Sequence, residues 1–90
     1  MTKIIQDVKF GHNLKKIRNA KGYTQRDICA KLDLMGRPTL QSTYAQIESG
    51  KRNIFLSDLI ALKQILDVDY DELFEGIKPI NKNEQDRNKS

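Results

Sequence analysis

One segment of the chain, residues 39–52 with the sequence TLQSTYAQIESGKR, constrains the fold more than any other. If this segment is a helix, Leu40, Tyr44 and Ile47 fall at positions i, i+4 and i+7 and form one apolar face. The opposite face carries no charge, although a surface helix ordinarily presents Lys and Glu to water. It consists of small or amide side chains, namely Gln41, Ser42, Ala45 and Gln46. The segment therefore predicts a helix that is packed on one side and uncharged on the other.

Amide side chains on an exposed helix are suited to reading DNA, because each amide carries a hydrogen-bond donor beside an acceptor. This pair matches N7 and N6 of adenine in the major groove. Gly50 favours the end of the helix, and the turn Lys51-Arg52-Asn53 follows it with two cations and an amide. Cations beside such a helix are typical of groups that bind phosphate. Without further context, an ordinary polar helix and a solvated loop would contain the same residue types.

Length and composition exclude several classes of protein. Ninety residues suffice for one small domain. No apolar run approaches the roughly 20 residues that cross a bilayer, and residues 1–10 lack the apolar region of a signal peptide, so we expect a cytoplasmic protein without a membrane partner. A single cysteine and a single histidine cannot supply a disulfide or a four-ligand zinc site, so no metal or cofactor is expected.

Charge is unevenly distributed along the chain, whose net charge is +4. Residues 1–56 contain eleven Lys and Arg against four Asp and Glu, a net of +7. Residues 57–77 contain one Lys against six acids, a net of −5, and residues 78–90 contribute +2. Such segregation is expected if one face binds a polyanion such as nucleic acid. On charge alone, chance asymmetry of a solvated surface explains it equally well.

Hydrophobic residues recur at helical spacing in four further segments, and no segment shows the alternation of a strand. Asp7, Thr24 and Asp69 are suitable N-caps, and the third helix is expected to be capped by Thr39 or a neighbour. We therefore predict an all-α fold of five helices, which comprise residues 8–21, 25–34, 39–49, 57–66 and 70–74.

The predicted helices define the domain organisation of the chain. We expect an N-terminal arm over residues 1–7, one helical domain over 8–76 and a flexible tail over 77–90. The tail is predicted because the chain from Lys78 onward has a single apolar residue, Ile80, and cannot bury a core.

The order of these elements resembles the Xre/Cro–CI family of phage and bacterial repressors, which have a five-helix lambda-repressor-like helix-turn-helix domain. The resemblance covers about residues 8–76. It is carried by LKKIR at 14–18, GYTQ at 22–25, ICA at 28–30, STYAQIE at 42–48, GKR at 50–52, LDV at 66–68 and DEL at 71–73. It implies a sequence-specific regulator of transcription, expected to be a repressor, which binds double-stranded DNA as a homodimer on a palindromic operator.

The resemblance also implies roles for individual residues. The helix over residues 39–49 would enter the major groove, with base-facing side chains at Gln41, Ser42 and Gln46. The residues implied to contact phosphate are Gln25, Thr43, Lys51, Arg52 and Asn53, of which Thr43 would face the DNA backbone or a thymine methyl group. Arg18 and Glu48 correspond to an ion pair that joins the first helix to the third. Three features depart from the family pattern: a longer connection over residues 33–39, Cys29 in place of the usual alanine, and Leu40 where a Ser or Thr cap is common.

Other interpretations of single residues remain open at this point. Cys29 is interpreted as a buried spacer rather than a redox sensor, because no basic neighbour lowers its pKa. Tyr44 is placed in the core, although its hydroxyl could reach a phosphate. Phe74, Ile77 and Ile80 form either a patch for a second subunit or packing at a helix end.

Two other functions compete with DNA binding. An antitoxin-like or other protein-interaction module could bind a protein partner through the acidic fourth and fifth helices. An enzyme is not expected, because the chain has no phosphate-binding glycine loop, no nucleophile–histidine pair at a suggestive spacing and no metal cluster.

Overall fold

The computed structural model describes residues 3–4 and 8–77 of the chain. Within these residues the chain forms five helices: α1 (Val8–Ala20), α2 (Gln25–Leu34), α3 (Gln41–Glu48), α4 (Leu56–Leu66) and α5 (Tyr70–Leu73). The predicted all-α fold is confirmed, and each helix end lies within two residues of its predicted position. The predicted cap Asp7, the residue Ile80 and the tail from residue 78 onward lie outside the described residues.

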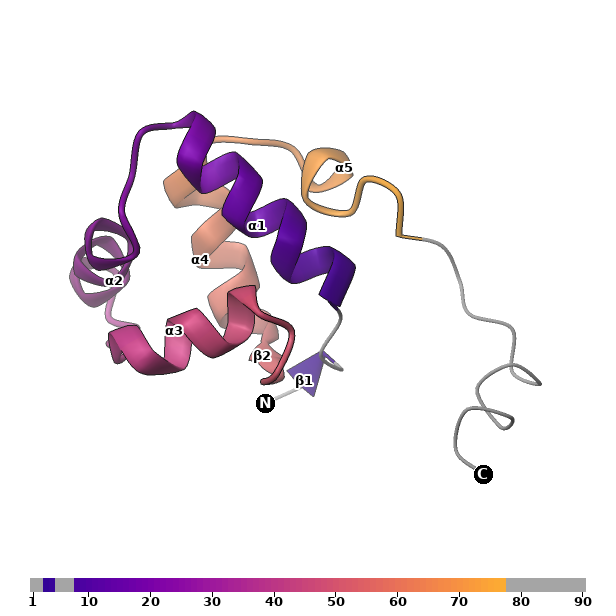
Figure 1. Cartoon of the computed structure of the whole chain (residues 1–90). Helices are drawn as coiled ribbons and strands as arrows, with labels where there is room; N and C mark the ends of the chain where they lie inside the picture. Colours follow the sequence, from indigo (N-terminus) through magenta and orange to yellow (C-terminus); the bar gives the residue numbers. More distant parts are fainter. Residues whose placement is uncertain (1–2, 5–7, 78–90) are drawn as a thin grey trace, which may run out of the picture.

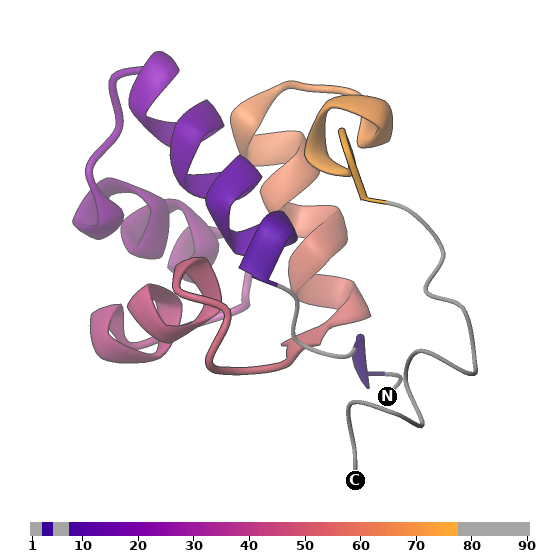
Figure 2. The ribbon, with the colours of Figure 1, turned by 45° about the vertical axis from the view of Figure 1, so that its right-hand side comes forward.

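The helices form a single bundle (Figure 1). α1 contacts both α3 and α5, while α2 contacts α3 and α4. In Figures 1 and 2, α3 and α5 lie at opposite ends of the bundle. Each helix contributes a side chain with at most 1% exposure to the common core, and these are Leu14, Ile28, Tyr44, Leu62 and Leu73. None of the described helices is long and apolar enough to cross a membrane.

One short pair of strands accompanies the helices in the described part of the chain. β1 (Lys3–Ile4) pairs antiparallel with β2 (Ile54–Phe55), with Lys3 opposite Phe55 and Ile4 opposite Ile54. Strands of two residues are too short to show a period-2 pattern, so the sequence carries no signal for them. The pairing joins the beginning of the chain to the segment that follows α3, and Ile54 enters the core at 3% exposure.

Leu40 also departs from its predicted position on the apolar face of the third helix. Tyr44 and Ile47 are buried, but Leu40 is 73% exposed. The reason is that α3 begins at Gln41, and Leu40 is its N-cap residue with extended backbone angles (φ −67°, ψ 145°). Helical spacing therefore does not apply to it. Thr39 does not cap α3 either, because its hydroxyl donates to the carbonyl of Arg37 at 3.0 Å.

Backbone contact between α1 and α3 depends on Gly11. A Cβ atom at this position would lie 2.3 Å from the carbonyl oxygen of Glu48 and 2.7 Å from that of Ile47. Real atoms do not approach so closely, so only glycine allows α1 to cross the end of α3 at this distance. Farther along α1, the Asn13 amide donates to the carbonyls of Leu73 (3.0 Å) and Glu75 (2.8 Å). α1 is therefore fastened to α3 on one side and to α5 on the other.

Candidate nucleic-acid interface

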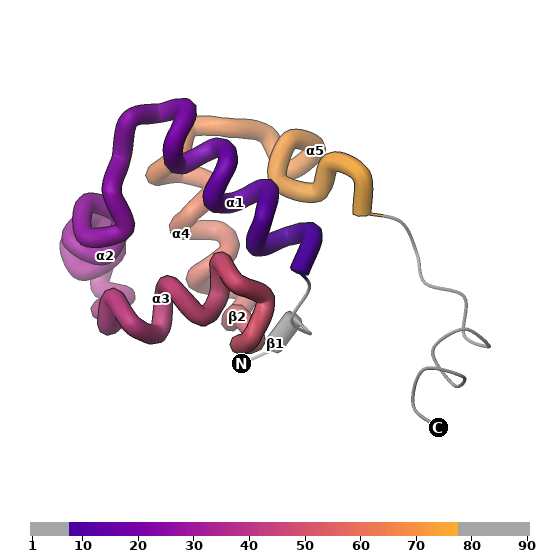
Figure 3. The backbone as a smooth tube through the Cα atoms, in the orientation of Figure 1, coloured from indigo at the N-terminus to yellow at the C-terminus, as the bar shows by residue number. Residues whose placement is uncertain are grey.

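The outer face of α3 is the surface that the sequence predicted to read DNA. Figure 3 shows α3 along one edge of the molecule, with α1 and α4 on its inner side. Gln41, Ser42 and Gln46 are exposed, whereas Tyr44 and Ile47 are buried. The structure therefore brings the three predicted base-facing residues together on one uncharged, solvent-facing surface. We call this surface, consisting of Gln41, Ser42 and Gln46, the amide face.

The turn after α3 places two exposed cations beside the amide face. Gly50 has a φ of +76°, a conformation that favours glycine, and reverses the chain direction. The amide of Lys51 and the hydroxyl of Ser49 then donate to the carbonyl of Gln46 at 2.9 and 3.1 Å. Arg52 follows, and its Nε donates to Oε1 of Gln46 at 2.9 Å. The turn is thus folded against the last turn of α3, with Lys51, Arg52 and Asn53 all exposed.

A buried ion pair holds α3 in place from the inside. Arg18 Nε donates to Glu48 Oε2 at 2.6 Å and Arg18 Nη2 donates to Glu48 Oε1 at 3.1 Å, while Arg18 Nη1 donates to the carbonyl of Tyr23 at 2.8 Å. Arg18 and Glu48 are 7% and 6% exposed. Burial acts to raise the pKa of the Glu48 carboxyl, but hydrogen bonds from Arg18 and Gln25 help to hold it below its ordinary value. The chain therefore contains the ion pair that the resemblance implied between the first and third helices.

Gln25 takes part in the same buried network. Its Nε2 donates to Glu48 Oε1 at 3.1 Å, so the side chain links the first residue of α2 to the end of α3. The preceding residue, Thr24, forms a capping box with Asp27: the Thr24 hydroxyl accepts from the Asp27 amide at 3.0 Å, and the Thr24 amide donates to Asp27 Oδ2 at 2.8 Å. These bonds lower the pKa of Asp27. The sequence indicated the cap but not the structural role of Gln25.

Tyr44 and Cys29 have structural surroundings. Tyr44 is fully buried, and burial raises the pKa of its hydroxyl, so it belongs to the core and does not reach a phosphate. Cys29 packs partly buried against the core, and burial raises the pKa of its thiol. A raised pKa disfavours the reactive thiolate. Within residues 3–4 and 8–77, no cluster of three or more His, Cys, Asp or Glu side chains could hold a metal ion.

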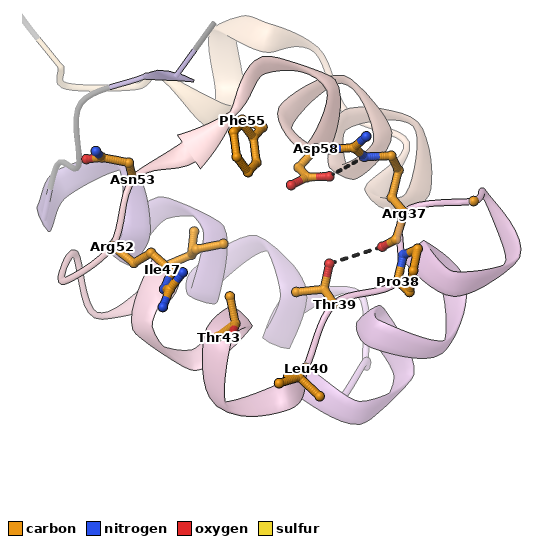
Figure 4. Close-up of a pocket in the computed structure, with 11 residues that line it drawn as sticks. Arg37, Pro38, Thr39, Leu40, Thr43, Ile47, Arg52, Asn53, Phe55 and Asp58 are labelled. Carbon is orange, nitrogen blue, oxygen red and sulfur yellow. Dashed lines mark hydrogen bonds and ion pairs between the residues drawn. The ribbon is translucent and has the colours of Figure 1, made fainter. Parts of the chain in front are cut away.

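A groove of about 410 Å³ lies between the α2–α3 connection, α3 and the start of α4. Figure 4 shows Arg37 and Asp58 facing each other at one side of the groove, with Arg37 Nε and Asp58 Oδ1 2.7 Å apart. This ion pair fastens the long connection to α4. The sequence offered no signal for it, since the two residues are 21 positions apart and belong to different elements. Thr43 and Arg52, both predicted to contact phosphate, line the opposite side.

Comparison with known proteins agrees with this geometry. A family model described as helix-turn-helix matches residues 14–73, a stretch that extends from α1 to the end of α5. The chain belongs to the helix-turn-helix family. The control protein C.MunI of a Mycoplasma species is 35% identical over 72 residues, which are 79% of this chain and 90% of that protein.

A protein of known structure has the same fold. The restriction-modification controller protein C.AhdI of Aeromonas hydrophila matches with a TM-score of 0.65 and 33% identity, over 74% of this chain and 94% of that one. The resemblance to Xre/Cro–CI helix-turn-helix domains is thus confirmed. The chain is a sequence-specific DNA-binding regulator of transcription.

Proposed function

We propose that the protein is a transcriptional repressor that binds a palindromic operator as a homodimer and reads the major groove with α3. The observation that carries this proposal is the amide face of α3, exposed and uncharged, with the cations of the following turn beside it. Gln41, Ser42 and Gln46 would contact base edges, for which amide and hydroxyl groups are suited. Repression then requires only that the bound protein cover a promoter.

Contacts to phosphate would supply much of the affinity. Among residues 8–56 the exposed cations are Lys9, Lys15, Lys16, Lys21, Arg26, Lys51 and Arg52. The proposed phosphate contacts are Gln25, Thr43, Lys51, Arg52 and Asn53. Gln25 is the first residue of α2, and the N-terminal end of a helix attracts anions. Each neutralised phosphate releases counterions, so we expect affinity to fall steeply with salt.

A homodimer would place two copies of α3 about 34 Å apart, one turn of the duplex. The end of the molecule away from α3 offers a contact surface, because Tyr70 and Phe74 are 39% and 38% exposed and stack with their ring centroids 6.1 Å apart. Ile77 packs against the core, which favours helix-end packing for this residue. We therefore place the dimer contact at Tyr70 and Phe74.

The proposal involves no enzymatic step, no cofactor and no membrane, and it places the protein in the cytoplasm, where bacterial DNA is accessible. The alternative is an antitoxin-like interaction with another protein. The exposed acids Asp67, Asp69, Asp71, Glu72 and Glu75 favour a basic partner surface at this end of the molecule. Measurement of the mass of the complex in solution, with and without duplex, distinguishes a homodimer on DNA from such a complex.

In vitro selection from random duplexes tests the proposal directly. We expect enrichment of one palindromic sequence, and repression of a reporter that carries it in its promoter. Gln46→Ala should then weaken binding to that sequence by about 1–3 kcal/mol and relax one base position, whereas Lys51→Ala should weaken all sequences alike. If selection enriches no sequence, or if both variants lose affinity equally on every duplex, base reading by α3 is wrong.

A further inference from the structure

The hydrogen bond between Arg52 and Gln46 connects a proposed phosphate contact to a proposed base contact. Arg52 Nε and Gln46 Oε1 are 2.9 Å apart, and both residues are exposed. The backbone keeps them together, because the Lys51 amide and the Ser49 hydroxyl both bond to the carbonyl of Gln46. The Arg52 side chain also lines the groove with Thr43 and Ile47 (Figure 4). The contact therefore lies on a folded turn rather than between two long side chains that meet by chance.

This hydrogen bond determines which atoms Gln46 can offer to DNA. A guanidinium N–H can only donate, so the amide atom that faces Arg52 must be the oxygen. When Oε1 faces Arg52, the Nε2 group points away from the turn and offers its two N–H donors. Without Arg52, the amide could rotate by 180° about its last torsion and would offer donor and acceptor in either order.

We propose that Arg52 is a positioning residue that sets the base preference of Gln46. This inference rests on the proposed function, since it assumes that Gln46 meets the edge of a base pair. Guanine presents two acceptors in the major groove, N7 and O6, whereas adenine presents the acceptor N7 beside the N6 donor. A Gln46 amide whose oxygen is held by Arg52 matches guanine. An amide that is free to rotate can instead turn its oxygen toward N6 and its nitrogen toward N7, and so match adenine.

The test compares base preference at the position read by Gln46 in several full-length variants. Selected duplexes are varied at each base pair, and relative affinities are measured for the wild type, Gln46→Ala, Arg52→Met and Lys51→Ala. Arg52→Met retains a long apolar stem beside Ile47 and Thr43 but removes the donor. Lys51→Ala is the matched control, because it also removes one exposed cation from the same turn and has no side-chain bond to Gln46 in the described structure.

We expect the wild type to prefer guanine at the base pair where Gln46→Ala loses discrimination. Arg52→Met should change the guanine-to-adenine affinity ratio at that same base pair by roughly 5- to 150-fold, the range of one bidentate base contact. In Gln46→Ala the further change Arg52→Met should leave the ratio unaltered. Lys51→Ala should lower affinity without changing any ratio.

Two results would overturn the inference and leave the proposed function intact. If Arg52→Met lowers affinity uniformly, as Lys51→Ala does, Arg52 acts only on phosphate. If it changes the preference at a different base pair, Arg52 reads a base itself. Failure of the wild type to select any duplex would instead contradict the proposed function. Circular dichroism of each variant establishes that the exposed substitutions leave the fold unchanged.

Discussion

Gly11→Ala tests whether backbone contact between α1 and α3 determines the position of the amide face. Helix propensity alone predicts that this substitution stabilises the protein by about 1 kcal/mol, since glycine is a poor helix former. The structure predicts the opposite sign. The added Cβ would lie 2.3 Å from the Glu48 carbonyl oxygen, whereas an ordinary contact between carbon and oxygen measures about 3.3–3.6 Å.

Relief of this overlap requires α1 and α3 to separate by about 1 Å at a place where the neighbouring atoms are backbone. Overpacking of a core costs about 1–3 kcal/mol, and more where the surroundings cannot yield. With a steric cost of about 3 kcal/mol and the gain in helix propensity of about 1 kcal/mol, we expect a net loss of about 2 kcal/mol. For a domain of this size the midpoint of thermal unfolding should fall by roughly 8–16 °C.

Thermal unfolding followed by circular dichroism measures this change. The control is His12→Ala, an exposed position on the same helix, for which the change should stay within about 0.5 kcal/mol. A midpoint for Gly11→Ala at or above that of the wild type would refute the reasoning, because it would show that α1 and α3 have room for a methyl group.

Three further predictions concern the ion pair and the dimer. Glu48→Ala should destabilise the domain by about 3–5 kcal/mol in urea unfolding at pH 7, because it leaves the buried guanidinium of Arg18 unpaired; a loss below 1 kcal/mol would argue against burial of the pair. Because folding lowers the pKa of Glu48, its carboxylate contributes fully to the stability of the fold above the unfolded-state pKa of about 4.3. This contribution disappears as the pH falls through the lower pKa of the folded state. The difference in stability between the wild type and Glu48→Ala should therefore shrink below about pH 4 and stay constant between pH 6 and 8. Tyr70→Glu should shift the protein toward monomer in sedimentation experiments with little change in helix content, and an unchanged dimer would place the interface elsewhere.

Features encoded by neighbouring residues were predictable from the sequence. The start of α2 follows from local chemistry, because Thr24 and Asp27 form a capping box within four residues. The inward positions of Tyr44 and Ile47 follow from helical spacing, and the exposure of the amide face follows from the same pattern. The ion pair between Arg18 and Glu48 could be predicted only from the family resemblance, because the sequence alone does not show which basic residue pairs with which acidic residue.

Features that depend on the approach of distant elements were not predictable. The ion pair between Arg37 and Asp58 forms only when the α2–α3 connection packs against α4. The close contact at Gly11 likewise forms only when α1 packs against α3, whereas the sequence by itself shows only a glycine that weakens a helix. Leu40 was misplaced because α3 begins two residues later than predicted, so that Leu40 precedes the helix and helical spacing does not apply to it. The bond between Arg52 and Gln46 crosses a turn whose shape depends on Gly50.

The attachment of α1 to α3 on one side and to α5 on the other has a consequence for operator architecture. Gly11 and Arg18 fix α1 to α3, and Asn13 fixes it to α5, where we propose that the second subunit binds. Because α1 is one continuous helix of 13 residues, no hinge separates its contacts with α3 from its contact with α5. This rigid helix would therefore fix the distance between the two copies of α3 in a dimer. The two half-sites of the operator would then need a constant spacing. One inserted base pair rotates one half-site about the DNA axis by about a tenth of a turn relative to the other, and a rigid dimer could not adjust to this rotation.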